Sequence, residues 1–122
     1  MPQTVDKYKA LQTFWSSFKL TAYDQNTVPI GATLPYLTYE SRVADLDEPV
    51  QVTASVWYRS KSWEEASKKA DEIAEYIKKM KPIKFDGGYI HITNIGQQRM
   101  TDEDDSIRRV VISVNMEFLS NW

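Results

Sequence analysis

The sequence feature that most constrains the fold is a stretch in which the spacing of apolar residues changes from two to three and four. Apolar and polar side chains alternate over residues 50–59, which is typical of a strand with one face on a core. The apolar residues that follow recur at helical spacing and form one stripe between charges: Trp63, Ala66, Ala70, Ile73, Ile77 and Met80. We therefore predict a strand over 49–59 followed directly by an amphipathic helix.

The limits of this helix can also be predicted. Ser62 followed three residues later by Glu65 matches a capping box, which would satisfy free backbone N–H groups at the start, and Pro82 ends the helix. Acid-to-lysine pairs four residues apart stabilise its solvent face by only a few tenths of a kcal/mol each, on the order of 0.2–0.5. Burial of the apolar stripe must therefore hold the helix, and the stripe requires a sheet beneath it.

Composition limits the class of protein. A chain of 122 residues suits a single domain, 1–122, and a net charge of −2 gives no overall positive field that would attract nucleic acid. There is no cysteine for a disulfide or a thiolate site. No apolar run is long enough to span a membrane and no signal-peptide pattern is present. We expect a globular protein made in the cytoplasm, without membrane association.

The other elements follow from shorter patterns. The order of elements is then α-β-β-α-β-β, which predicts an α+β two-layer sandwich with a roughly four-stranded mixed or antiparallel sheet and two helices on one face. The strands over 34–41 and 49–59 should pair as an antiparallel hairpin. We expect the following ranges: an amphipathic helix over 5–20, a loop over 21–33, a strand over 34–41 that is an edge strand or begins beside one, one kinked strand over 83–93 around a turn or bulge at Asp86–Gly88, and a final strand from Arg108 to Phe118 or Leu119.

One face of such a sheet is left without helices. If Val52, Val56 and Tyr36 point toward the helices, three large side chains point away from them: Leu37, Tyr39 and Trp57. An apolar face of this size is unusual on a soluble monomer. We expect these three residues to form a contact between subunits.

Few residues are arranged as an active or metal site. His91 is the only histidine, so a zinc site is not expected, and we predict no cofactor and no enzymatic activity. An acidic run lies in the connection between the last two strands: Asp102, Glu103, Asp104 and Asp105. It lacks the ligand alternation of a calcium loop. It is either a solvated loop tip or a partner contact. A ligand-binding or enzymatic alternative would use Tyr36, Tyr39, His91 and Asn94.

Four segments carry a resemblance to a known family: PYLTYES, VTASVWYRSKSWEEASKKADEI, FDGGYIHIT and QQRMTDEDDSIRRVVISVNMEF. In this order and spacing they resemble the tail terminator proteins, also called minor capsid proteins, of long-tailed bacteriophages that infect Gram-positive bacteria. The likeness covers about residues 14–120. It implies a hexameric ring at the head-proximal end of the tail tube that stops tube polymerisation and meets the head connector, with genome DNA passing through the lumen.

The resemblance also gives the acidic run a role. If Asp102–Asp105 project into the lumen or onto one ring face, they would repel DNA phosphates or complement a basic partner surface. A head-completion or connector-stopper ring protein is the alternative function. In either case we expect the protein in the virion, assembled in the host cytoplasm.

Overall fold

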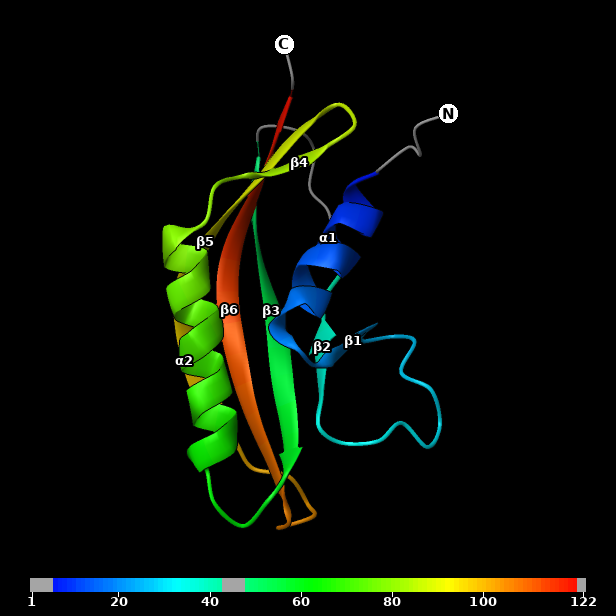
Figure 1. Ribbon diagram of the computed structural model, residues 1–122, viewed down its shortest axis with the longest axis vertical. Coiled ribbons are helices and arrows are strands. Elements are labelled where there is room, and N and C mark those ends of the chain that lie inside the picture. The colour runs from blue at the N-terminus through cyan, green and yellow to red at the C-terminus, as the bar shows by residue number, and fades with distance from the viewer. Residues whose placement is uncertain (1–5, 43–47, 121–122) are drawn as a thin grey trace.

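The computed structural model describes residues 6–42 and 48–120 and shows a twisted six-stranded sheet with two helices on one face (Figure 1). Across the sheet the strands lie in the order β1-β2-β3-β6-β5-β4. β1 pairs with β2 in parallel, and every other pair is antiparallel. The elements are α1 (Lys7–Trp15), the 3₁₀ turn η1 (Ser16–Phe18), β1 (Thr21–Asp24), β2 (Tyr36–Tyr39), β3 (Pro49–Arg59), α2 (Glu64–Lys79), β4 (Ile83–Phe85), β5 (Gly88–Met100) and β6 (Ile107–Ser120).

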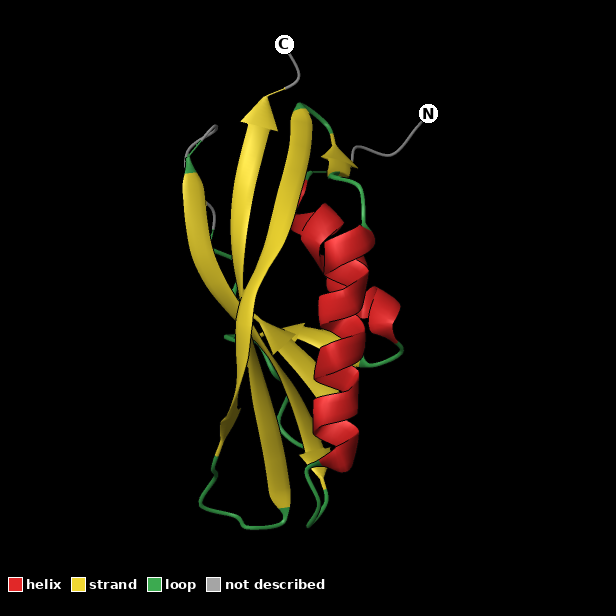
Figure 2. Cartoon of the chain, turned by 90° about the vertical axis from the view of Figure 1, so that its left-hand side faces the viewer, coloured by secondary structure: helices red, strands yellow, loops and turns green. Residues whose placement is uncertain are grey.

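The expected four-stranded α+β sandwich is wrong, because the sheet has six strands and the fold is mostly β. β1 lies in a stretch that we expected to be loop. The expected strand over 83–93 is two strands, β4 and β5, joined by a tight turn, and β5 continues to Met100. The long strands β3, β5 and β6 twist strongly along their length and form a curled sheet around α2 (Figure 2).

The two long central strands form the floor of the core. β3 and β6 pair over their length, from Pro49 opposite Glu117 to Arg59 opposite Ile107. The inward residues of the pair are almost fully buried: Val52, Ala54, Val56, Val110, Ile112, Val114, Met116 and Phe118. The predicted alternation in this pair of strands is confirmed.

α2 covers β3, β5 and β6 with its apolar stripe. Ala66, Ala70, Ile73 and Ile77 are buried, and Trp63 and Met80 are partly buried at the two ends. The capping box is not formed, because Ser62 Oγ accepts from the N–H of Glu64 at 3.1 Å, and the Ser62 N–H donates to Ser60 Oγ. Packing therefore contributes most of the stability of this helix.

α1 packs beside α2 on the same face of the sheet (Figures 1 and 2). It is shorter than expected: Asp6 caps its start by accepting from the Lys9 N–H at 2.8 Å, and Lys19 takes a left-handed conformation with φ 65° after η1. The Trp15 ring stacks on Tyr39 with centroids 6.2 Å apart. Phe14 lies 6.2 Å from Tyr76 of α2, so the two helices share one core.

The tight turn between β4 and β5 requires a glycine. Gly87 has a φ of 103°, which an L side chain adopts only with strain. We expect Gly87→Ala to lower the free energy of unfolding by about 1–2 kcal/mol. Gly96→Ala is the matched control, because nothing lies within 4 Å of the added Cβ, and its effect should stay within about 0.5 kcal/mol. Urea denaturation measures both; equal effects would refute a conformational requirement at Gly87.

Candidate functional site

The acidic run lies at the tip of the β5–β6 hairpin, at the opposite end of the molecule from the β4–β5 turn (Figure 1). All four acidic side chains are exposed. The tip is tied to the connection between β3 and α2, because the Ser60 N–H donates to the Ser106 carbonyl at 2.7 Å. Its position is therefore set by the sheet.

Asp104 is the anchor of this loop. Its carboxylate accepts from the Ser106 hydroxyl at 2.6 Å and from the Ser106 N–H at 2.9 Å, and lies 3.5 Å from the guanidinium of Arg59. The hydrogen bonds from Ser106 and, to a smaller extent, the charge of Arg59 lower the pKa of Asp104 below its ordinary value. Within the described chain, Asp104 is the only member of the acidic run that forms an ion pair.

Arginines surround the base of the same loop. Two guanidinium groups contact the ring of Trp63: the guanidinium carbons of Arg99 and Arg108 lie 5.3 and 5.2 Å from its centroid. Arg108 also donates to the carbonyls of Asp105 at 2.7 Å and Lys61 at 2.9 Å. Positive charge thus offsets much of the negative charge at this end, and Asp102, Glu103 and Asp105 remain as outward carboxylates.

The lowered pKa of Asp104 predicts a pH-dependent loop. The folded carboxyl has a lower pKa than the unfolded one, so its contribution to order is complete above the ordinary carboxyl pKa and is lost as the pH falls through the folded value. We expect the exchange protection of the Ser106 N–H to fall at acidic pH. In Asp104→Ala, which lacks the acceptor oxygen, this protection should be low throughout and should change little with pH. Amide hydrogen exchange measures the protection of the Ser106 N–H in the wild type and in the variant. The same pH dependence in the two proteins would contradict the prediction.

The sheet face away from the helices carries an aromatic row, defined as Tyr23, Tyr36 and Trp57 with Arg109. Neighbouring ring centroids lie 5.7 and 6.2 Å apart, and the Arg109 guanidinium carbon lies 4.5 Å from the Trp57 ring centroid. Trp57 Nε1 donates to Thr38 Oγ1 at 2.9 Å. All four members of the row are half-buried. No helix of the described chain covers this face (Figure 2).

Trp57 thus lies on the expected face, but Leu37 and Tyr39 do not. Register places Leu37 opposite Val56 and Tyr39 opposite Ala54, both of which point into the core. Leu37 is fully buried, and burial raises the pKa of the Tyr39 hydroxyl, which donates to Gln12 Oε1 in α1. It is Tyr36 that shares the outer face with Trp57, so the expectation for Leu37 and Tyr39 is wrong by one residue of register.

One edge of the sheet is open. β4 pairs only with residues Gly88–Ile90 of β5, and from His91 to Met100 no described strand pairs with that side of β5. A register shift between Asn94 and Gly96 breaks the regularity of this edge. An unpaired edge presents N–H and C=O groups that can bind another chain.

The four residues of the ligand-binding alternative do not meet. His91 and Asn94 line one groove between β5 and α2, but Tyr36 lies on the outer face of β2 and Tyr39 on its inner face, and neither tyrosine lines that groove. Within residues 6–42 and 48–120, no three acidic or imidazole side chains converge as a metal site. Neither α1 nor α2, the helices of this part of the chain, is long and apolar enough to cross a membrane.

Comparison with known proteins gives a likeness of fold. No family model and no curated protein sequence matches the chain. The fold is similar to a chain in a solved structure described as the virion of a native gene transfer agent particle, with a TM-score of 0.64 and 15% sequence identity. The match covers 88% of this chain and 83% of that chain. At this identity the likeness establishes the fold alone.

Proposed function

We propose that this protein is a structural subunit of a bacteriophage or phage-like virion and that it acts as a tail terminator. The observation that carries the proposal is the fold shared with a virion chain over most of both molecules. The resemblance of four sequence segments to tail terminators supports the finer role. In this role the protein forms a hexameric ring at the head-proximal end of the tail tube, stops tube growth and joins the tail to the head connector.

The surfaces of the protomer suit such an assembly. The aromatic row and the open edge of β5 are different surfaces, and contacts between unlike surfaces produce rings when the rotation closes. We expect Trp57 to contact a neighbouring copy. Genome DNA would pass through the lumen without sequence-specific binding.

The geometry of the acidic tip limits its proposed role to three of its four carboxylates. Asp104 holds the loop, so Asp102, Glu103 and Asp105 are the groups that would repel DNA phosphates or meet a basic partner surface. The neutral variant Asp102→Asn/Glu103→Gln/Asp105→Asn should fold normally but assemble infectious particles poorly. Unchanged DNA retention and infectivity would remove this role.

A tube-capping assay tests the proposal. The protein is mixed with assembling tail-tube subunits, and tube lengths are measured by electron microscopy. We expect shorter tubes with one capped end, and shortening that increases with protein concentration. Tubes of unchanged length would contradict the tail terminator role. Binding to isolated head connectors in the same experiment would then favour the head-completion alternative.

A further inference from the structure

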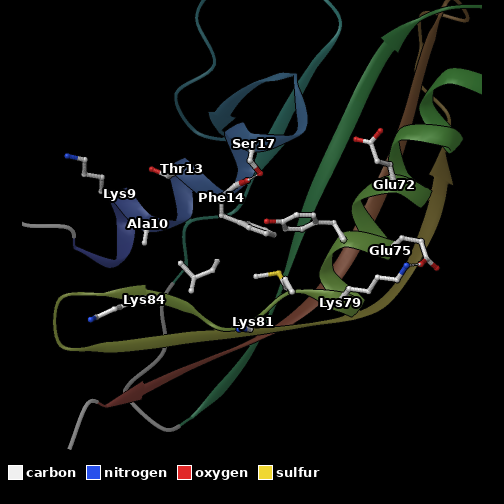
Figure 3. Close-up of a pocket in the computed structure, with 13 residues that line it drawn as sticks. Lys9, Ala10, Thr13, Phe14, Ser17, Glu72, Glu75, Lys79, Lys81 and Lys84 are labelled. Carbon is white, nitrogen blue, oxygen red and sulfur yellow. Dashed lines mark hydrogen bonds and ion pairs between the residues drawn. The ribbon is translucent and has the colours of Figure 1, made fainter.

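A groove of about 940 Å³ lies between α1, α2 and β4 (Figure 3). Its floor is apolar and comes from all three elements: Ala10, Phe14, Tyr76, Met80 and Ile83. Tyr76 is 51% exposed even though its ring lies 5.2 Å from Phe18 and 6.2 Å from Phe14. An aromatic side chain this exposed in a concave apolar site marks a surface that a partner can bury.

The rim of the groove is charged unevenly. At one end Glu72 lies 3.0 Å from Lys69, and Glu75 lies 3.7 Å from Lys79, so the acidic charges of the rim are paired. Along the β4 side of the groove Lys81 and Lys84 are exposed and form no ion pair within the described chain (Figure 3). The groove therefore suits a segment with apolar side chains followed by carboxylates.

The chain itself contains two acidic runs, and only one of them also carries apolar side chains. Residues 102–105 include no apolar side chain, and Asp104 is already paired with Arg59. Residues 43–48, VADLDE, combine Val43 and Leu46 with three carboxylates. Glu48 is exposed, and the rest of this segment, 43–47, lies outside the described residues.

We propose that residues 43–48 of one copy bind in the groove of a second copy, with their aliphatic side chains on its floor and their carboxylates at Lys81 and Lys84. The contact joins two different surfaces, so repetition of it produces a ring or a filament. The inference rests on the proposed function in taking the protein to be a ring subunit, and it names one contact of that ring.

A charge-swap experiment with the full chain tests the contact. Variant one reverses the groove, Lys81→Glu/Lys84→Glu, and variant two reverses the segment, Asp45→Lys/Asp47→Lys. Like charges then meet in every contact within either variant, and we expect self-association of each to weaken at least on the order of a hundredfold. In an equal mixture, opposite charges meet in every contact between unlike copies. Assembly should therefore return, and copies of the two variants should alternate.

The readout is mass by sedimentation at low salt, where charge contacts are strongest. Circular dichroism checks folding, and a single chain that carries all four substitutions should assemble as the wild type does. Lys61→Glu/Lys68→Glu is the control, because these exposed lysines lie outside the groove. Wild-type monomers, a groove variant that still assembles, or a mixture that does not recover would each overturn the inference. If the swap works but tubes are not capped, the contact stands and the proposed function fails.

Discussion

Replacing Ile73 with Asp should leave the protein unfolded at room temperature. Ile73 is fully buried in the middle of the α2 stripe, where the helix meets the sheet. A carboxylate in that position loses its hydration and finds no cation, and the aliphatic packing is lost as well. The combined cost exceeds about 4–5 kcal/mol, which is comparable with the whole stability of a typical domain, about 5–15 kcal/mol.

The matched control is Lys68→Asp, which introduces the same side chain at an exposed position of the same helix. It should change the free energy of unfolding by about 0.5–1 kcal/mol through helix propensity and local charge. Circular dichroism with urea denaturation measures both variants. A cooperative unfolding transition of Ile73→Asp near that of the wild type would mean that α2 does not cover the sheet.

The second large effect separates two neighbouring residues of β2. Leu37→Ala should lower the free energy of unfolding by about 2–5 kcal/mol, because Leu37 is fully buried between the sheet and the helices. Tyr36→Ala should cost about 1 kcal/mol, since it removes only the ring contacts with Tyr23 and Trp57 on the outer face.

Urea denaturation of the two variants side by side tests the register of β2. The expected order is a large loss for Leu37→Ala and a small one for Tyr36→Ala. A larger loss of unfolding free energy for Tyr36→Ala would contradict this register. It would instead support the expectation from the sequence, in which Leu37 and Tyr39 point away from the helices. Self-association of both variants should be recorded in the same samples, because only Tyr36 borders the predicted subunit contact at Trp57.

Long periodic segments could be predicted from the sequence, because every second side chain of a strand, and every third or fourth of a helix, must face the core. β3 was predicted within its observed bounds, Pro49–Arg59, and β6 within one or two residues. The predicted stripe of α2 is the one that is buried. The antiparallel pairing of β2 with β3 is likewise confirmed.

Elements that depend on a neighbour were missed. β1 has four residues, TAYD, and forms a strand because β2 offers a parallel partner. The second half of β5 is polar, with Gln97, Gln98 and Arg99 in succession, and its pairing with β6 holds it in the sheet. The residue patterns within β1 and within this half of β5 do not reveal the pairing of either one with its neighbouring strand.

The candidate site was predicted only in part, for two physical reasons. Tyr36, Leu37 and Tyr39 put large side chains on both faces of β2, so period two does not reveal which face is inside. The acidic tip was located correctly, but its anchoring through Arg59 and Ser106 links residues 47 apart in the chain. The groove was missed because its floor comes from three separate elements.

The native mass of the wild-type protein in solution tests the central claim most directly. Sedimentation over a range of concentrations should show one closed species near 85 kDa, six times the 14.2 kDa of a single chain. A species of 14.2 kDa at every concentration, with or without tail-tube subunits, would contradict a ring-forming virion protein.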